Sequence, residues 1–165
     1  MLQLIVLGLG SNIGNREKYL KTALKLLSLK KNFLYIASSG IYETEPWGFK
    51  YQNNFLNCVS VFLYRSGPYE LQHEIIGIEQ KVGRIKREKW HAREIDIDIL
   101  FFGDKIIHKK NLLIPHPMIS QRYFVLVPLS EILPEFIHPG TKRKISSLLK
   151  NSKDTGTVKL YKKNI

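Results

Sequence analysis

The sequence predicts an α+β fold, in which helices cover an antiparallel β-sheet. Three observations indicate this class: apolar runs of strand length, two segments whose apolar residues recur at helical spacing, and loops of proline, glycine and polar residues between them. The chain has 165 residues and 44% hydrophobic content, which is enough for one ordinary globular core. We therefore expect a single domain over residues 1–165.

The N-terminal part predicts a buried strand followed by a helix. Residues 2–9 form an apolar run that ends in the polar turn GLGSNIGN. Asn15 can cap a helix over residues 16–29, because an asparagine side chain accepts a hydrogen bond from the first helical turn. One face of that helix carries apolar residues at helical spacing, namely Leu20, Ala23, Leu24 and Leu27.

The middle of the chain predicts two more strands and a second helix. Strands are expected over residues 32–42 and 55–65, on either side of a polar loop at 43–54 that contains proline and glycine. Pro68 suits the first turn of the helix that follows. Apolar residues at helical spacing extend this helix to Gly83, which can end it.

The next segment is a charged loop followed by a strand with acidic residues on one face. Residues 84–93 carry no apolar period and are expected to be an exposed loop. Isoleucines at 95, 97 and 99 then alternate with Glu94, Asp96 and Asp98, which is the period of a strand. The turn Gly103-Asp104 predicts a hairpin between this strand and a short strand at 105–108.

The remaining third should supply the second cover of the sheet. It contains the irregular segment IPHPM, an apolar stretch at 124–136, a short helix at 145–150 and an edge strand at 157–161. The order strand–helix–strand–strand–helix–strand before it is the ferredoxin-like arrangement, whose antiparallel sheet has helices on one face. With the C-terminal third on the other face, we expect a three-layer αβα domain.

Composition leaves two interpretations of the strong positive charge. The net charge is +12, which is typical either of a protein with an anionic partner or of a lysine-rich solvated surface. The lysines are scattered, which favours the solvated surface, whereas Arg84, Arg87, Arg93 and Arg122 cluster near the acidic strand or the His-Pro segment. No run approaches the about 20 apolar residues of a membrane span. The single cysteine, Cys58, suits a buried position and a reducing, cytoplasmic location.

Asp96 and Asp98 are candidate metal ligands. Residues two apart on a strand point to the same face, and carboxylates held side by side raise each other's pKa unless a cation lies between them. Mg²⁺ is commonly held by one or two carboxylates together with substrate phosphates. The alternative is that these residues form the solvated face of an amphipathic strand.

Other motifs have weaker interpretations. The glycines of GLGSNIGN are spaced too widely for a dinucleotide-binding fingerprint and favour a tight turn. Aromatic residues near loops are more often core, although two of them could bracket a flat heterocycle. Asn57 shares a strand face with Phe55 and could pair with the edge of such a ring. His116 lies between two prolines, with Arg122 nearby, an arrangement that can grip phosphate.

Four blocks of the chain match a family pattern in order. They are GSNIGN, YETEPWGFKYQNNFLN, the stretch from Glu79 through VGRIKREKWHAREIDIDILFFG, and IPHPMISQRYFVLVPLSEILPE. Over residues 4–140 the chain resembles the 6-hydroxymethyl-7,8-dihydropterin pyrophosphokinases of folate biosynthesis. The resemblance implies a cytoplasmic, monomeric transferase that moves pyrophosphate from ATP to the pterin alcohol with two Mg²⁺ ions. It implies no nucleic-acid or membrane partner.

The resemblance also implies roles for single residues. Asp96 and Asp98 would hold the metals, and Arg84, Arg93, His116 and Arg122 would act in catalysis. These four would also bind ATP, together with Glu79 and Lys86. The pterin would contact Thr44, Pro46, Trp47, Phe55, Asn57, Trp90 and Phe124, with the two phenylalanines sandwiching its ring. His91-Ala92 and Met118 depart from the family pattern, which concerns loop closure rather than the reaction.

Two other functions remain alternatives from the sequence. Paired carboxylates on a strand also serve nucleotidyl transferases, which would release pyrophosphate instead of AMP. The charge of +12 and a sheet with aromatics also suit an RNA-binding module. The aromatics are not arranged as a sheet stacking motif, however, which counts against RNA.

Overall fold

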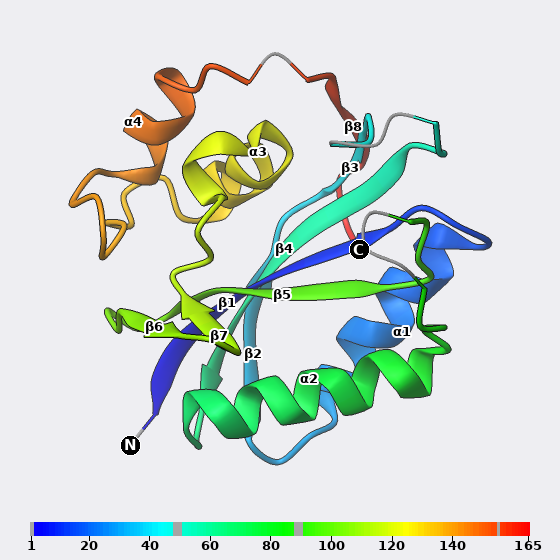
Figure 1. Ribbon diagram of the computed structural model, residues 1–165, viewed down its shortest axis with the longest axis horizontal. Helices are drawn as coiled ribbons and strands as arrows, with labels where there is room; N and C mark the ends of the chain where they lie inside the picture. Colours follow the sequence, from blue (N-terminus) through cyan, green and yellow to red (C-terminus); the bar gives the residue numbers. More distant parts are fainter. Residues whose placement is uncertain (1, 48–50, 88–90, 155) are drawn as a thin grey trace.

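The protein has an α+β fold in three layers (Figure 1). This computed structural model describes residues 2–47, 51–87, 91–154 and 156–165. In chain order the elements are β1 (Gln3–Ser11), α1 (Arg16–Ser28), β2 (Phe33–Ser38), β3 (Ile41–Thr44), β4 (Phe55–Tyr64), α2 (Pro68–Val82), β5 (Asp96–Phe102), β6 (Ile107–Lys109), β7 (Leu112–Ile114), a 3₁₀ turn (Ile119–Gln121), α3 (Tyr123–Ile132), α4 (Ile145–Lys150) and β8 (Val158–Lys162).

The main sheet is antiparallel and has β1 and β4 at its centre. Its order is β5-β1-β4-β3-β8, and β2 also pairs with β4. The sheet therefore has the strand order of a ferredoxin-like core, extended at one edge by β8. The predicted fold class is confirmed. The edge strand expected near the C-terminus is β8, which pairs with β3.

Alternating residues of the central strands build a core on each face of the sheet. Ile5, Leu7 and Leu9 of β1 are buried in the cluster that includes the apolar faces of α1 and α2. Val6 of the same strand packs in the second cluster, with residues of α3 and α4. Figure 1 shows α1 and α2 on one side of the sheet and α3 and α4 on the other. Because both faces of β1 are covered, the strand carries an unbroken run of apolar residues and glycine from Leu4 to Gly10.

The helix ends follow the sequence signals. The Asn15 side chain accepts a hydrogen bond from the Lys18 amide at 3.1 Å, as expected for a helix cap. Pro68 lies in the first turn of α2. Gly83 ends that helix with φ of 108°, a left-handed conformation that favours glycine. The predicted helices 16–29 and 68–82 are confirmed to within one residue.

The predicted hairpin between the aspartate strand and residues 105–108 is wrong. Residues 107–109 form β6, which pairs with β7 and not with β5. Only Lys110 and Asn111 separate β6 from β7, and two-residue loops favour a local hairpin. The open edge of β5 is contacted by the following segment, where the His116 amide donates to the Leu100 carbonyl at 3.1 Å.

The single strand predicted over residues 32–42 is divided in two. Ser39 and Gly40 separate β2 from β3, and the Ser39 hydroxyl accepts a hydrogen bond from the Val59 amide at 3.0 Å. A Cβ atom at Gly40 would lie 2.9 Å from the Lys162 carbonyl oxygen of β8. The break therefore allows β8 to approach β3 closely, a contact between distant segments that the local pattern does not reveal.

Helix α3 is attached to the sheet by an acidic side chain near its C-terminal end. The Glu131 carboxylate accepts hydrogen bonds from the Gly40 amide, at 3.1 and 3.2 Å to its two oxygens, and from the Tyr42 hydroxyl at 2.9 Å. The helix occupies the start of the apolar stretch at 124–136, and Pro128 lies within it. None of the helices in the described ranges is long and apolar enough to cross a membrane.

Candidate active site

Asp96 and Asp98 lie on β5 beside two glycines of β1. In the strand register Asp96 faces Gly10 and Asp98 faces Gly8. These glycines leave space at the site, since a Cβ atom on Gly10 would lie 2.6 Å from the Asn57 side-chain oxygen. The glycines of the GLG sequence thus make room for the side chains of the site, instead of binding phosphate as in a dinucleotide-binding fold.

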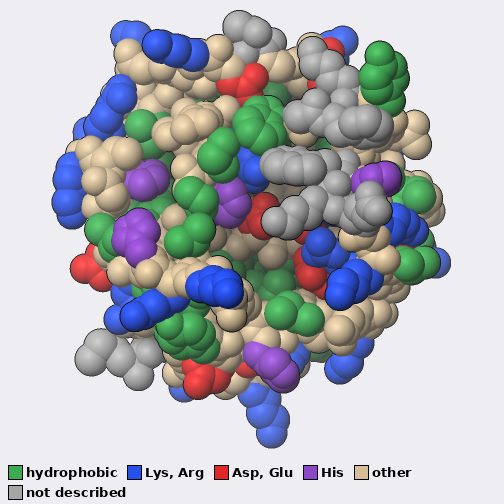
Figure 2. All heavy atoms as spheres, in the orientation of Figure 1, with side chains coloured by type: hydrophobic (Ala, Val, Ile, Leu, Met, Phe, Trp, Pro, Cys, Tyr) green, Lys and Arg blue, Asp and Glu red, His purple; other side chains and the backbone are tan. Residues whose placement is uncertain are grey.

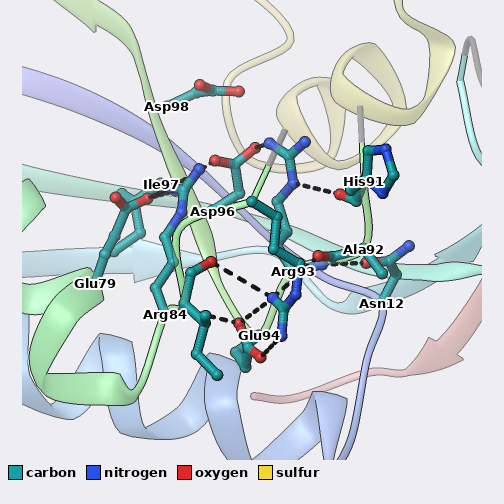
Figure 3. A network of polar contacts seen from close by, with 12 residues as sticks. Asn12, Glu79, Arg84, His91, Ala92, Arg93, Glu94, Asp96, Ile97 and Asp98 are labelled. Atoms are coloured by element: carbon teal, nitrogen blue, oxygen red, sulfur yellow. Dashed lines mark hydrogen bonds and ion pairs between the residues drawn. The ribbon is translucent and has the colours of Figure 1, made fainter. Parts of the chain in front are cut away.

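Two arginines converge on Asp96 from the charged loop (Figure 3). Arg84 contacts Oδ1 of Asp96 at 2.8 Å, and Arg93 contacts Oδ2 at 2.7 Å. Arg84 also pairs with Glu79 of α2. Each oxygen of Asp96 is therefore held by a different guanidinium, and the two arginines are brought to the same side chain from the beginning and the end of one loop.

The acidic groups around these arginines differ in their protonation behaviour. Burial raises the pKa of Glu79 to about 7, although Arg84 and a hydrogen bond from the Ile97 amide at 2.8 Å oppose the rise. Desolvation in the cleft, together with the charge of Asp96, raises the pKa of Asp98 to about 6. Arg122 lies 3.9 Å from Asp98 and only partly offsets that charge repulsion.

His116 is a neutral hydrogen-bond donor at the same cleft. Burial, and then the charge of Arg122, lower the pKa of His116 to about 4. Its Nδ1 accepts a hydrogen bond from the Met118 amide at 3.2 Å, so the ring proton resides on Nε2. The imidazole can therefore donate to an anionic oxygen without itself carrying charge.

These groups line a polar cavity of about 580 Å³. Figure 2 shows acidic side chains in a hollow near the middle of this face, with basic, histidine and apolar side chains around it. Every residue that the sequence analysis assigned to ATP or metal lines this cavity: Glu79, Arg84, Lys86, Arg93, Asp96, Asp98, His116 and Arg122. The cavity thus combines three or more fixed positive charges with a pair of carboxylates, as a polyphosphate–metal site requires.

A second, smaller cavity of about 120 Å³ adjoins the aspartates. Thr44, Trp47, Phe55, Asn57 and Phe124 line it, together with Arg93, Asp96, Asp98 and Arg122, which also line the larger cavity. The two cavities therefore meet at the acidic pair. Pro46 is half-buried between two lining residues and, in the part of the chain that is described, does not line the cavity itself. Trp90 lies outside the described residues.

The smaller cavity has aromatic walls and a fixed polar edge. The Arg122 guanidinium lies 5.0 Å from the ring centre of Trp47 and 5.6 Å from that of Phe124, which are cation–π distances. Asn57 is buried, and its Nδ2 donates to the Thr44 hydroxyl at 2.7 Å. This bond orients the amide so that its oxygen is turned away from Thr44. Flat aromatic walls with an oriented amide suit a heterocycle.

Sequence reasoning missed two residues that hold the charged loop. Asn12 is buried, its Oδ1 accepts from the Arg93 amide at 2.8 Å, and its Nδ2 donates to Gln52 at 2.9 Å. Glu94 is also buried and pairs with Arg87 through two bonds of 2.6 and 2.9 Å. The alternation in the sequence predicts Glu94 on the acidic face of the strand, yet β5 begins only at Asp96. The many charged residues of this loop were the one sequence feature that could have indicated an ion pair between Arg87 and Glu94.

The chain matches a family model over residues 6–134, described as 7,8-dihydro-6-hydroxymethylpterin-pyrophosphokinase (HPPK). The 2-amino-4-hydroxy-6-hydroxymethyldihydropteridine pyrophosphokinase of Aquifex aeolicus (strain VF5) is 43% identical over 158 residues, which cover 95% of this chain and 94% of the relative. The enzyme of the same name from Bacillus subtilis (strain 168) is 39% identical over 80% of this chain and 79% of its own length.

Solved structures show the same fold. A crystal structure of wild-type Plasmodium falciparum HPPK-DHPS with pteroate aligns with 91% of this chain at a TM-score of 0.74 and 18% sequence identity. This chain spans 44% of that longer protein, and at this identity the likeness concerns the fold alone. The family model and the relatives of similar length establish family membership: the chain belongs to the 7,8-dihydro-6-hydroxymethylpterin-pyrophosphokinase family.

Proposed function

We propose that the larger cavity binds ATP, that the smaller cavity binds the pterin alcohol, and that Asp96 and Asp98 hold two Mg²⁺ ions where the cavities meet. As a member of its family, the chain transfers pyrophosphate from ATP to 6-hydroxymethyl-7,8-dihydropterin, a step of folate biosynthesis. The observation that carries the proposal is that the acidic pair borders both cavities. Donor and acceptor of the pyrophosphoryl group can therefore be brought to the same two side chains.

The donor set fits Mg²⁺. The described residues contain no group of three or more His, Cys, Asp or Glu side chains that could enclose a metal ion. Two carboxylates alone leave most coordination positions to water and phosphate oxygens, which is how Mg²⁺ is usually held by enzymes that act on nucleotides. When bound there, Mg²⁺ would neutralise phosphate charge and lower the pKa of the hydroxymethyl oxygen.

The side chains of the larger cavity would hold and polarise the triphosphate. The pterin hydroxyl would lose its proton to water as its oxygen attacks the β-phosphorus. A new O–P bond would form in line with the bond from that phosphorus to the α,β-bridging oxygen, which breaks, and AMP would leave with the bridging oxygen. Arg84, Arg93 and Arg122 would contact the oxygens on which charge accumulates, and His116 would donate from Nε2. No protein nucleophile is needed, and burial raises the pKa of the Cys58 thiol to about 12, which makes it unsuited to that task.

The smaller cavity would fix the pterin. Phe55 and Phe124 would contact the two faces of the ring. Its edge would be contacted by four residues: Asn57, Thr44, Pro46 and Trp47. Trp90 would also contact the pterin, and Glu79 would belong to the ATP site. The hydrogen bond between Asn57 and Thr44 supports this assignment. Because the amide is already oriented, it can hydrogen-bond the edge of a heterocycle with little further loss of side-chain entropy.

The unit that acts would be the single pyrophosphokinase domain over residues 1–165, working as a monomer in the cytoplasm without nucleic-acid or membrane partners. The pairing of β8 with β3 supports one domain, because it joins the last strand to the sheet that carries the site. Without bound metal, the two aspartates that line the larger cavity would repel a nucleic-acid backbone.

Product analysis tests the proposal. The purified protein is incubated with ATP and Mg²⁺, with and without 6-hydroxymethyl-7,8-dihydropterin, and nucleotides are separated by chromatography. AMP should form only when the pterin is present, and chelation of Mg²⁺ should abolish it. Release of inorganic pyrophosphate would instead indicate nucleotidyl transfer, and ADP formation would indicate transfer of the γ-phosphoryl group alone.

A further inference from the structure

A short C-terminal segment joins the two walls of the smaller cavity from outside. It consists of residues 152–154 and 156–157, between α4 and β8, and we call it the C-terminal connector. In Figure 1 it runs from α4 past α3 to the edge of β3. The family model ends at residue 134, so the connector lies beyond the matched part of the chain.

At one end the connector caps the helix that carries the aromatic wall. Asp154 Oδ2 accepts a hydrogen bond from the Tyr123 amide at 2.8 Å, and its Oδ1 accepts from the Gly156 amide at 2.9 Å. Tyr123 is the first residue of α3, and the side chain of Arg122, at the N-cap position before it, makes no capping hydrogen bond. A carboxylate from a distant segment thus satisfies a free helical amide and interacts favourably with the helix dipole. Tyr123 lies directly between Arg122 and Phe124, which both line the smaller cavity.

At the other end the connector holds the opposite wall. The Thr157 hydroxyl donates to the Glu45 carboxylate at 2.8 Å, and the Glu45 amide is paired with the Thr157 carbonyl at 3.4 Å. The next residue, Val158, is registered with Thr44 in the β3–β8 pair. Thr44 and Glu45 line the smaller cavity, so these contacts fix the backbone that faces the helix wall.

We propose that the connector sets the spacing of the pterin cavity, with Asp154 and Thr157 as positioning residues. This inference rests on the proposed function of that cavity. A ring held between two walls loses a large part of its dispersion energy when either wall moves by about 1 Å. The walls come from segments almost 80 residues apart, at Glu45 and Tyr123, and the connector is bonded to both.

The test compares substitutions at the two ends. Asp154→Ala removes both acceptors, Asp154→Asn keeps one oxygen for the Tyr123 amide, and Thr157→Val removes the hydroxyl at nearly constant volume. Asn151→Ala is the matched control, because the Asn151 side chain donates to the Ser147 carbonyl at the end of α4 and, among the described residues, contacts neither wall of the cavity through a hydrogen bond. Titrations of the pterin alcohol, at saturating non-hydrolysable ATP analogue and Mg²⁺, give the pterin Kd, and separate titrations give the Kd of the analogue.

Asp154→Ala should raise the pterin Kd about five- to tenfold and Thr157→Val about threefold, which are losses of the size expected when each variant loses its one side-chain hydrogen bond to a cavity wall. Asp154→Asn should recover part of the loss. The Kd of the analogue should stay within about twofold for Thr157→Val, and both constants should be unchanged for Asn151→Ala.

An unchanged pterin Kd in Asp154→Ala and Thr157→Val, or proportional losses for both ligands in Thr157→Val, would overturn the inference. Thermal midpoints of all variants separate such losses from general destabilisation. If Asp154→Ala does not fold, Asp154→Asn and Thr157→Val still test the inference. In each, the rise in the pterin Kd is compared with any rise in the Kd of the ATP analogue. A wild-type protein that binds no pterin overturns the proposed function and this inference together. Normal wild-type binding with unaltered variants overturns the inference alone.

Discussion

Asp96 and Asp98 differ in their surroundings although they lie two positions apart on one strand. Asp96 is held by Arg84 and Arg93 at 2.8 and 2.7 Å, whereas the nearest cation to Asp98 is Arg122 at 3.9 Å among the described contacts. Desolvation, and then the charge of Asp96, raise the pKa of Asp98, and the distant arginine opposes that rise only in part. Loss of the two carboxylates should accordingly affect the protein differently.

Asp98→Asn should lower kcat by at least about 100-fold, because the variant removes a charged ligand from the proposed metal site. The thermal midpoint should stay constant or rise slightly, since a repulsion with Asp96 disappears. Asp104→Asn, an exposed change in the turn just after β5, serves as the control. Steady-state kinetics and thermal unfolding of both variants check the prediction, and near-normal turnover in Asp98→Asn would contradict the metal assignment. Asp96→Ala should lose turnover as well.

Phe124→Ala should weaken pterin binding far more than ATP binding, because the ring lines the smaller cavity and is absent from the lining of the larger one. Loss of ring stacking corresponds to about 1–3 kcal/mol, or roughly five- to 150-fold in Kd. Phe136→Ala is the matched control, since that ring packs on Phe101 with 4.8 Å between centroids, in the second core. Titration of each ligand against each variant gives the comparison. Equal losses for the two ligands would count against the ring sandwich.

The charged loop between α2 and β5 is closed at its base by buried polar contacts. Glu94 binds Arg87 through two hydrogen bonds and accepts a third from the Ile85 amide at 3.2 Å. The Arg87 pairing, opposed by some desolvation, lowers the pKa of Glu94 from 4.5 to about 2. The loop thus presents Arg84 and Arg93 to the site from a fixed base.

This pKa shift predicts a pH dependence of stability. A carboxyl whose folded-state pKa is depressed stabilises the fold fully above its unfolded value, and the contribution is lost as pH falls from about 4.5 toward 2. Glu94→Gln should therefore lower the free energy of unfolding at pH 7 and flatten its decline below pH 5. Denaturant unfolding at several pH values measures this. Glu135→Gln, which alters an exposed ion pair with Lys144, is the control, and a decline as steep in Glu94→Gln as in the wild type would refute the assignment.

The sequence predicted elements well where local rules decide them. The Asn15 cap, the Pro68 start, the Gly83 end and the alternation around Asp96 are all properties of a few adjacent residues. The prediction failed where segments far apart in the sequence compete for the same strand edge. The β6–β7 hairpin replaced the expected pairing with β5, and β8 requires the break at Gly40.

The same distinction applies to the candidate site. Asp96, Asp98, His116 and Arg122 could be selected because they occur in short motifs, and the structure brings them to one cavity. Asn12 could not be selected, because its partners at Gln52 and Arg93 are 40 and 81 residues away. The contacts of Asp154 and Thr157 are likewise non-local, and their residue types alone carry no signal.

At the scale of the whole molecule, the net charge of +12 invites a test of nucleic-acid binding. If the charge serves mainly as a solvated surface, single-stranded RNA should bind only weakly and lose its affinity as salt rises toward physiological strength. Fluorescence titration with a labelled oligonucleotide over a series of salt concentrations checks this. Tight binding at physiological salt that persists in the double variant Asp96→Ala/Asp98→Ala would favour the RNA-binding alternative.

Helix α3 is fastened at both ends, by Asp154 at its first amide and by Glu131 to Gly40 and Tyr42. A helix secured in this way resists sliding along the sheet when ligands arrive, so we expect rearrangement on binding in two other described segments, residues 51–54 before β4 and residues 84–87 and 91–93 of the charged loop. Hydrogen exchange should then reveal a rigid frame in α3, slow to exchange with or without nucleotide, and a ligand-dependent slowing confined to those two segments.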